Sequence, residues 1–480
     1  KMHSKFSFEQ GAPKTIVYVD NNGKELGNFS EINGELVGKA YYPTGQVRTE
    51  YRYKDGKATG TCKYYSRAGV IESVYEYLDG QIHGKVEEYY PDQSVKVTLY
   101  YENGSQHGPY QSYYSDGKPN VQGWYQYGNA QQQWVSYHPN GKKRADEYFL
   151  NDKLTGKSYY YSLEGTPFEI TTHRDGNADD MVIFNQEGTA ISKLSKEGNK
   201  VAASINYPSG KDNQRFNFLC GKMHGKSTIH YPDGRLFTAR NYSRGKLTGL
   251  AQRFSIFHGL ENSGMYNDGN SEGTWTWFFE DGTREVVGHY FNDKRDSVWT
   301  YFYDNGKVAS TIPYLDGEKQ GVSKHYSYDG QLILEKMYNA GDIISYRLPA
   351  SNDWIEFYGN GVILAKFPDG KPALEENFKN GKLMGIAKAY YPNGKMFFER
   401  RYWYGDFEGQ QTYYHSDGKI KQKEFYNRDD SHGKWESYDG LGRLVWVRNY
   451  SWGYLQGTAE QYTNGKKIKE IKFWYGLPVE

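Results

Sequence analysis

The sequence is poor in cysteine and in long apolar runs, and each lack excludes a class of protein. Only Cys62 and Cys220 occur in 480 residues, which is too few for a disulfide framework. They occupy different positions in the repeat described below, so we do not expect them to pair with each other. No apolar run approaches the roughly 20 residues that a membrane-spanning helix needs. The sequence therefore predicts neither a small disulfide-stabilised fold nor a transmembrane segment.

An excess of charge of one sign is also missing. The chain has 59 Lys and Arg residues and 58 Asp and Glu residues, which leaves a formal net charge of +1. Nucleic acids and anionic membranes attract proteins that have a basic patch or a large positive charge. We therefore expect no nucleic acid partner.

Motifs of catalysis and metal binding are missing as well. The sequence contains no HExxH, no GxSxG, no P-loop and no CxxC pair, and these motifs carry the commonest hydrolytic, nucleotide-binding and redox chemistries. Four histidines, His83, His107, His224 and His432, recur at one repeat position, just before a glycine. Packing at a turn explains that position, because neighbouring hairpins offer no carboxylate in fixed register to complete a metal site. We therefore predict no enzyme, with no catalytic residue, no cofactor and no metal site.

Glycine and tyrosine are abundant instead, with 55 and 48 residues. The stretch Gly225–Gly249 shows their pattern, because two runs of strand-forming residues flank the turn sequence Tyr231–Gly234. In that turn Pro232 presets φ for a type I turn, Asp233 suits the next position, and glycine accepts the positive φ that follows. A second turn at residues 243–245 returns the chain. One unit is therefore a β-hairpin followed by a return turn.

The unit repeats every 24 residues, and its register divides the chain into six segments. About 19 units can be counted if degenerate ones are included. The turn glycine is replaced at some positions, for example by His258. The segments are a degenerate N-terminal unit (1–33), a first regular block (34–176), degenerate repeats (177–216), a second block (217–341), an interruption (342–366), and a third block with a tail (367–480). None of the breaks is rich in proline or serine, so we interpret them as joints in a continuous array.

These repeats predict an all-β protein of stacked hairpins that form an elongated, twisted antiparallel sheet. Strand residues alternate between the two faces of a sheet. Counting from the turn, we expect three columns of residues to share the core face. They are the residue before the turn tyrosine, the residue two after the turn glycine, and the residue before the return turn. Examples are Tyr65, Tyr89 and Tyr414; Val47, Ile71 and Leu236; and Tyr53, Tyr77 and Tyr290. On this count Tyr414 lies in the core and Tyr413 on the opposite face.

The pattern resembles the MORN repeat in its bacterial variant form. The unit Gly381–Lys395, with Glu399 and Tyr402 after it, matches that pattern almost throughout, and the resemblance covers nearly the whole chain. The segment Tyr438–Leu444 also resembles a YD repeat of toxin-encapsulating shells, but the 24-residue step counts against that class. Eukaryotic MORN proteins are scaffolds at membranes and the cytoskeleton, and bacterial variant members are often labelled antitoxins. The family has no catalytic residues, so the resemblance implies a scaffold without enzymatic activity.

We therefore expect a repeat scaffold that binds other proteins along its length. We place it in a bacterial envelope or secreted assembly, in the periplasm, at the outer membrane or outside the cell. One alternative is a glycan- or peptidoglycan-binding module, because exposed aromatic rings stack on sugars. Another alternative is an antitoxin that neutralises a toxin by direct binding.

Two consecutive units carry aromatic residues on the face opposite the expected core, where most units have small or polar residues. Between them, the intervening strand is expected to add Thr283, Glu285 and Val287 to the same face. If these rings are exposed, they form an apolar patch that would receive a protein or, alternatively, a glycan, because Trp and Tyr dominate binding hot spots. The other interpretation is that the sheet curls and buries them under residues 342–366 or the chain ends. The six candidate residues are Trp275, Trp277, Phe279, Trp299, Tyr301 and Tyr303.

Overall fold

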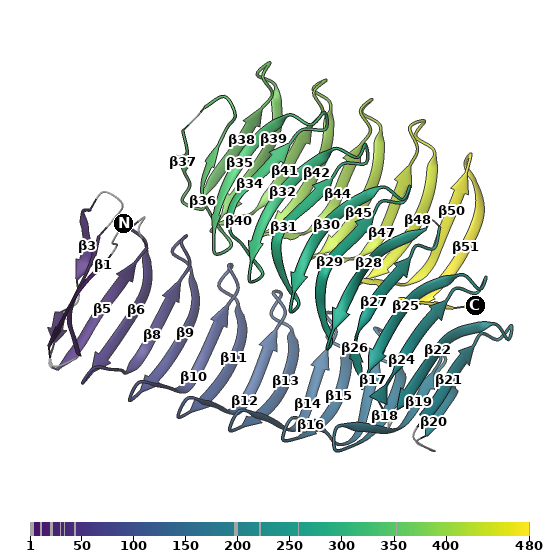
Figure 1. Cartoon of the computed structure of the whole chain (residues 1–480), viewed down its shortest axis with the longest axis horizontal. Coiled ribbons are helices and arrows are strands. Elements are labelled where there is room, and N and C mark those ends of the chain that lie inside the picture. The colour runs from purple at the N-terminus through teal and green to yellow at the C-terminus, as the bar shows by residue number, and fades with distance from the viewer. Residues whose placement is uncertain are drawn as a thin grey trace. The chain divides into compact units, whose positions relative to one another are not determined.

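The computed structural model describes residues 4–9, 12–19, 23–28, 30–32, 34–42, 45–195, 200–219, 222–257, 259–351 and 353–479. These residues form strands joined by turns, and none of them belongs to an apolar helix that could cross a membrane. Successive hairpins pair antiparallel within each sheet (Figure 1). The predicted all-β array of hairpin repeats is therefore confirmed. Lys1, Cys220 and His258 lie outside the described residues.

The chain divides into two compact units, Lys1–Gly176 and Asn177–Glu480. The first unit contains a three-stranded sheet, β1–β3, and a longer sheet that runs from β4 to β18. Leu36 packs against Tyr18, Tyr51 and Tyr53 near the start of the longer sheet. The strands are β1 (Ser4–Glu9), β2 (Ala12–Val19), β3 (Glu25–Asn28), β4 (Ser30–Ile32), β5 (Glu35–Tyr41), β6 (Val47–Lys54), β7 (Lys57–Ala58), β8 (Gly60–Tyr65), β9 (Ile71–Leu78), β10 (Gln81–Tyr89), β11 (Val95–Glu102), β12 (Ser105–Tyr113), β13 (Pro119–Gln126), β14 (Asn129–Tyr137), β15 (Lys143–Leu150), β16 (Lys153–Leu154), β17 (Gly156–Tyr161) and β18 (Pro167–Arg174).

The second unit begins with a hairpin, β19 (Asn177–Phe184) and β20 (Ala190–Ser195), and continues with two long sheets. The sheet that follows this hairpin is called the second sheet. It comprises β21 (Lys200–Asn206), β22 (Asp212–Leu219), β23 (Lys222–Met223), β24 (Gly225–His230), β25 (Leu236–Ser243), β26 (Lys246–Leu247), β27 (Gly249–Phe254), β28 (Leu260–Asn267), β29 (Asn270–Phe278), β30 (Arg284–Phe291), β31 (Lys294–Phe302), β32 (Val308–Leu315), β33 (Glu318–Lys319), β34 (Gly321–Tyr326), β35 (Leu332–Asn339), β36 (Asp342–Arg347) and β37 (Ile355–Glu356).

The third sheet comprises β38 (Gly361–Lys366), β39 (Pro372–Lys379), β40 (Lys382–Leu383), β41 (Gly385–Tyr390), β42 (Met396–Trp403), β43 (Asp406–Phe407), β44 (Gly409–Tyr414), β45 (Ile420–Asn427), β46 (Asp430–Ser431), β47 (Gly433–Tyr438), β48 (Leu444–Ser451), β49 (Tyr454–Leu455), β50 (Gly457–Thr463), β51 (Lys466–Trp474) and β52 (Leu477–Val479). The interruption at 342–366 is where the chain leaves the second sheet and enters the third.

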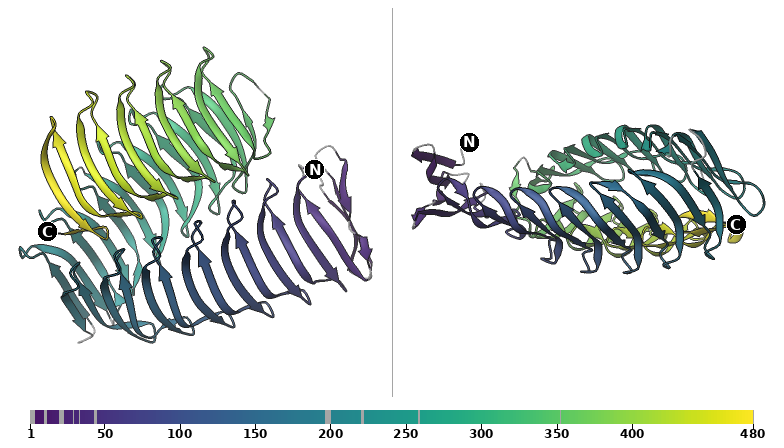
Figure 2. Two further views of the ribbon diagram at one scale, coloured as in Figure 1. Left: turned by 180° about the vertical axis from the view of Figure 1, so that it is seen from behind. Right: turned by 90° about the horizontal axis from the view of Figure 1, so that it is seen from below.

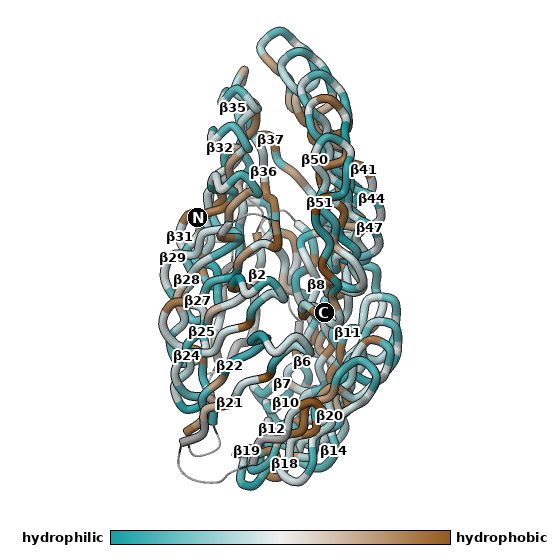
Figure 3. Tube along the Cα trace, turned by 90° about the vertical axis from the view of Figure 1, so that its right-hand side faces the viewer, coloured by the Kyte–Doolittle hydropathy of each residue, from teal (hydrophilic) through white to brown (hydrophobic). Residues whose placement is uncertain are grey.

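The second and third sheets pack face to face within the second unit, as the view from behind in Figure 2 and the edge-on view in Figure 3 show. Near the interruption, Leu334 of β35 packs in one core cluster with Ile363 of β38, and both side chains are fully buried. Farther along, Tyr231 packs in a second cluster with Ala459 and Phe473. Two sheets joined by buried apolar side chains therefore form the core of this unit.

The turns have the chemistry that the sequence predicts. In Tyr231–Gly234 the glycine N–H donates to the Tyr231 carbonyl at 2.8 Å, and the Tyr231 N–H donates to the Arg235 carbonyl at 2.8 Å. The Asp233 carboxylate accepts the Arg235 N–H at 3.1 Å. Gly234 has a φ of 88°, which glycine adopts without steric cost.

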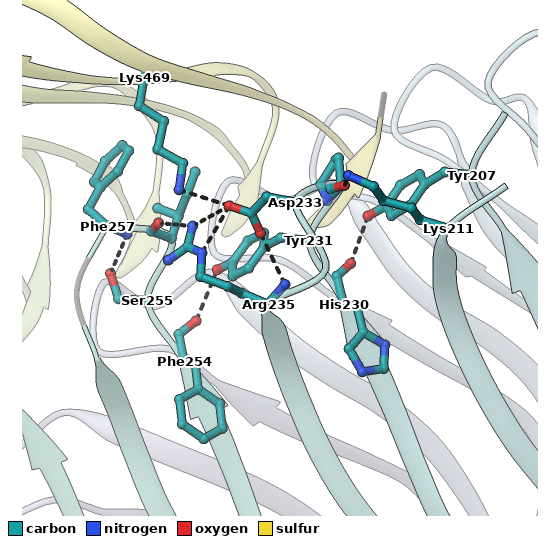
Figure 4. A network of polar contacts seen from close by, with 12 residues as sticks. Tyr207, Lys211, His230, Tyr231, Asp233, Arg235, Phe254, Ser255, Phe257 and Lys469 are labelled. Carbon is teal, nitrogen blue, oxygen red and sulfur yellow. Dashed lines mark hydrogen bonds and ion pairs between the residues drawn. The ribbon is translucent and has the colours of Figure 1, made fainter. Parts of the chain in front are cut away.

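A hydrogen bond from each turn tyrosine ties one repeat to the next. The Tyr207 hydroxyl donates to the His230 carbonyl at 2.7 Å, and the Tyr231 hydroxyl donates to the Phe254 carbonyl at 2.9 Å (Figure 4). In both, the acceptor lies 23 residues after the tyrosine. This bond holds neighbouring hairpins in register and accounts for the recurrence of tyrosine. The same bond is made by Tyr42, Tyr90, Tyr114, Tyr303 and Tyr391.

A β-bulge beside the turn reverses the predicted faces. Tyr414 is paired with Ile420, but Tyr413 is paired with Gln422, so the register shifts by one residue between them. One extra residue moves every later side chain of the strand to the other face. Tyr414 and Tyr426 therefore lie on opposite faces, and the prediction that both belong to one core face is wrong. We call the face with Tyr413 and Tyr426 the inner face and the opposite face the outer face.

The corrected assignment agrees with the contacts of both tyrosines. On the inner face, Tyr413 lies 5.2 Å from the guanidinium of Arg400, and its hydroxyl is 3.4 Å from the Glu424 carboxylate. Residues in the place of Tyr414 donate to carboxylates on the outer face instead, as Tyr65 does to Glu50 at 3.0 Å. The inner faces of the second and third sheets are the faces that pack together.

Candidate interaction surfaces

Trp275 and Trp299 lie on the inner face of the second sheet and are buried, at 8% and 2% exposure. Each indole lies over a glycine of the preceding strand. A Cβ added at Gly264 would be 2.0 Å from the Trp275 ring, and one at Gly288 would be 2.2 Å from the Trp299 ring. Each indole N–H donates to a backbone carbonyl, that of Met265 at 3.2 Å or that of His289 at 3.1 Å. These rings fill slots that glycine leaves open within the sheet.

The other four candidate residues are partly buried near Trp275 and Trp299. Trp277 lies 5.5 Å from Trp299, and burial together with neighbouring Tyr314 raises the pKa of Tyr301. Phe279 occupies a turn, where its carbonyl accepts the Gly282 N–H at 2.9 Å. Tyr303 also occupies a turn, and its ring lies 5.3 Å from Phe397 of the third sheet. The six rings therefore form no exposed patch. They are buried as in the alternative, but Tyr303 packs on Phe397 of the third sheet rather than on residues 342–366 or a chain end.

The intervening strand also differs from its prediction. Gly288 is paired with Trp275 and Val286 with Trp277, whereas Val287 is paired with Thr276. Val286, Gly288 and Tyr290 therefore share the tryptophan face. The expected Thr283, Glu285 and Val287 are displaced by the bulge between Trp277 and Phe278. Interior glycines 11 residues before a tryptophan, as at Gly264 and Gly288, are the sequence signal that marks these slots.

The exposed apolar side chains of these repeats lie on the outer face. Leu250 is paired directly with Met265, and Val298 with Pro313, so the apolar side chains adjoin across strands. Lys294 is paired with Phe291 and Glu318 with Leu315, which gives the surface charges of both signs at its margin. We call this surface the outer apolar row. Its exposed members, with their exposed fractions, are Leu250 (45%), Met265 (45%), Phe291 (57%), Val298 (54%) and Leu315 (57%).

The outer face of the first unit exposes aromatic side chains as well as the aliphatic Leu78 and Leu150. Trp124 is 36% exposed and Tyr148 is 48% exposed at the same position one repeat later. Tyr127, in the adjoining return turn, is 64% exposed, and its ring lies 4.7 Å from His107. These rings form a second, smaller candidate surface.

Polar clusters in the described residues have structural roles. No group of three or more His, Cys, Asp and Glu residues there could hold a metal ion. His224 and His432 each accept, at 3.4 Å, a backbone N–H of the return turn 20 residues later. The Ser323 hydroxyl lies 3.1 Å from His325 Nε2, but Ser323 has no solvent exposure, so a substrate could not reach it. Lys336 and Glu376 form a buried ion pair at 2.6 Å between the second and third sheets.

Comparison with known families identifies the repeats. The MORN repeat variant matches residues 35–55, 271–292, 295–316, 385–404 and 407–428. The MORN repeat matches residues 110–130 and 217–234. The chain carries MORN repeats. The sequence-based expectation of this repeat type is thereby confirmed, and the outer apolar row spans two of the matched variant repeats.

Solved structures give distant matches to the MORN-repeat chain, and no curated protein matches it. A crystal structure of TcdB2-TccC3-Cdc42 is 12% identical, covering 96% of this chain and 31% of that one, with a TM-score of 0.18. A crystal structure of TcdB2-TccC3 is also 12% identical, covering 98% and 33%, with a TM-score of 0.18. The Tc holotoxin pore of Photorhabdus luminescens is 11% identical, covering 99% and 31%, with a TM-score of 0.14. The chain spans about a third of the length of these chains, and similarity at this level carries no argument about function.

Proposed function

We propose that this MORN-repeat chain is a non-enzymatic scaffold that binds another protein through the outer apolar row. The observation that carries the proposal is the exposure of five large apolar side chains on one sheet face, from 45% at Leu250 to 57% at Leu315. Leu250 with Met265 and Val298 with Pro313 form two apolar pairs on this face, with Thr274 and His289 between them, and exposed apolar groups of this kind mark interaction sites. The hairpins beneath the row are tied together by backbone hydrogen bonds between return turns, as from the Gly269 N–H to the Leu247 carbonyl at 2.8 Å and from the Gly317 N–H to the Arg295 carbonyl at 2.9 Å. The surface is therefore preorganised, and little ordering cost accompanies binding.

The chemistry of the row favours a protein over a glycan. Leu250, Met265 and Val298 are flexible or branched aliphatic side chains, which complement the apolar core of a protein interface. Charged residues of both signs at its margin would contribute specificity rather than strong attraction. As part of the same proposal, we place the scaffold in a bacterial envelope or secreted assembly. A captured toxin would instead favour the antitoxin alternative.

The test is a charge substitution in the row. Val298→Asp with Leu315→Asp alters two side chains that are more than half exposed, at 54% and 57%, so the fold should persist. Leu441→Asp, at a turn residue with 69% exposure, is the matched control. Cross-linking and mass spectrometry in the native cell should show loss of a protein partner with the double variant and retention with the control. Replacing a central interface residue typically costs about 2 kcal/mol or more, which is roughly a 30-fold rise in Kd. An unchanged set of partners would reject the row as the binding surface.

A glycan-binding function is the second candidate, and the aromatic surface of the first unit is what favours it. Trp124 and Tyr148 present rings at one repeat spacing, and flat rings suit stacking on sugars. Trp124→Ala with Tyr148→Ala should then abolish sedimentation of the protein with purified peptidoglycan. Retention of binding, or no binding by the unaltered chain, would reject this function.

A further inference from the structure

The strand β38 forms an unprotected edge of the third sheet. Within the described residues it is paired on one side, with β39. Its side chains alternate, because Ile363 and Ala365 are buried in the core while Val362 and Leu364 are 53% and 39% exposed. Natural edge strands are usually blunted by charges, proline or a covering element. The one charge of β38 is Lys366 at its end, and the other five residues, Gly361–Ala365, contain neither a charge nor a proline.

The equivalent strand of the next repeat shows which kind of element can pair with this edge. One unit later, β41 is equivalent to β38, and it is paired on both sides. There Ala389 is paired with Leu374 and Lys388 with Glu375 of the preceding hairpin. Ala365 and Leu364 occupy these places in β38, 24 residues earlier. The β38 edge therefore has the form of a site that receives another antiparallel strand.

We propose that a second copy of this chain occupies the edge, with β38 pairing antiparallel to β38 of that copy about a two-fold axis perpendicular to the sheet. Residues directly opposite each other in an antiparallel pair share a face. With the axis at Ile363, Val362 lies opposite Leu364 of the second copy, and the Ile363 side chains stay packed in the cores of their own copies. Lys366 then lies opposite Asn360 of the second copy.

The residues of β38 favour pairing with a second copy in this register. The exposed positions Val362 and Leu364 are both apolar, so each pair across the axis is apolar with apolar. The two copies of Lys366 lie at opposite ends of the pair and do not repel each other. A head-to-tail contact with the other end of the described sheet is disfavoured, because Pro478 in β52 has no N–H to donate and β51 carries a row of lysines. An isologous contact of this kind closes on itself and gives a dimer rather than a fibre.

Sedimentation equilibrium tests the assembly independently of the outer apolar row. The unaltered chain of 55.4 kDa should show twice that mass at high concentration. Val362→Lys with Leu364→Lys should return it to the mass of one chain, because charges on an edge strand oppose pairing. The control, Leu441→Lys with Ile468→Lys, adds the same charge at side chains exposed by 69% and 59%, and it should leave the dimer intact. Circular dichroism would show that both variants keep their strands.

Cysteine cross-linking tests the register. A Val362→Cys chain mixed with a Leu364→Cys chain should give a disulfide-linked dimer on a non-reducing gel, because these residues lie opposite each other in the proposed pair. Each chain alone should cross-link far less, and the unaltered chain with its two native cysteines sets the background. A monomer at all concentrations, a dimer that survives the two lysine substitutions, or equal cross-linking of every sample would each overturn the proposal. A monomeric result would leave the edge to an extended segment of a different protein.

Discussion

The first unit and the second unit use the same repeat but cover their inner faces differently. In the longer sheet of the first unit, inner-face rings pack on one another within the sheet, as Tyr110 does on Trp134 at 5.5 Å. In the second unit, rings of one sheet also pack on the other, as Tyr328 does on Tyr391 at 5.0 Å. Turn hydrogen bonds of the same kind occur in both units, for example from Tyr90 and Tyr391. The hairpin is therefore a local structure, whereas the deep apolar core of the second unit depends on two sheets that face each other.

The presence of a facing sheet also changes which polar residues the inner faces of the second unit hold. Lys336 and Glu376 are 4% and 11% exposed in their side chains and pair across the two sheets at 2.6 Å. Burying either charge alone would be costly, so such pairs favour one alignment of the sheets over others. The same repeat therefore forms a sheet whose rings pack within it in the first unit and half of a sandwich in the second, with different residues at the inner positions.

The largest expected effect comes from a Leu→Ala substitution made at an inner-face position in each unit. Leu334 is fully buried between the second and third sheets, and Leu99 is 7% exposed on the inner face of the first unit. Leu334→Ala should cost about 4 kcal/mol of unfolding free energy, because two rigid sheets cannot collapse onto the cavity. Leu99→Ala should cost about 2 kcal/mol, because neighbouring side chains of one sheet can move into the space. Urea denaturation measures both, and equal losses would contradict the comparison.

The second prediction tests which face is turned toward the other sheet. Tyr413→Ala should cost about 3 kcal/mol, because it leaves a cavity beside Arg400 and removes one of the hydroxyl donors of the Glu424 carboxylate, which keeps its bond from Tyr426. Tyr414→Ala, on the outer face, should cost clearly less. Guanidinium denaturation of the two variants measures the difference. A larger loss for Tyr414→Ala would restore the assignment made from the turn alone.

The third prediction concerns a feature that both units share. A Cβ at Gly264 would lie 2.0 Å from Trp275 in the second unit, and one at Gly123 would lie 2.2 Å from Trp134 in the first. Gly264→Ala and Gly123→Ala should each cost about 2 kcal/mol, because both tryptophans must move. Gly440→Ala, with no atom within 4 Å of its added Cβ, is the control in thermal unfolding. Strongly unequal losses at the two tryptophan sites would show that the facing third sheet contributes to the slot at Gly264.

The smallest expected effect is a pH dependence of the contact between sheets. Although burial raises it, the pKa of Asp233 is lowered to about 2 by the Arg235 N–H, the Lys469 ammonium and the Arg235 guanidinium. Lys469 of the third sheet lies 3.0 Å away (Figure 4). Because the folded pKa is below the ordinary value of 3.8, the carboxylate stabilises the fold above about pH 4 and loses this effect between pH 4 and 2.

Both partners of this ion pair are partly exposed, so we expect less than about 1 kcal/mol from it. The stability difference between the unaltered chain and Asp233→Asn should be constant from pH 7 to 5 and vanish near pH 2. Asp417→Asn, at the same turn position in the third sheet, is the control within one sheet. A difference that grows as the pH falls would contradict the assigned sign.

The repeat, its turns and the all-β class can be predicted from the sequence, because these depend on local preferences. Gly234 and the residues before it specify one turn wherever they occur, and the 24-residue step sets the pairing of neighbours. The predicted faces were wrong because the bulge at Tyr413 and Tyr414 shifts the register by one residue, and alternation was counted through it. That error was local and could be avoided by counting each strand from beyond its bulge.

What covers each face depends on the path of the whole chain and could not be predicted from the sequence. The candidate patch at Trp275 and Trp299 could not be placed from spacing, because burial depends on glycines in neighbouring strands and on the face that the bulge selects. The reversal at 342–366, which brings Leu334 against Ile363, could not be foreseen either, since the repeats before and after it have the same pattern. Apolar burial is non-directional. A pattern can therefore mark a face as apolar, but the path of the whole chain determines which surface meets it.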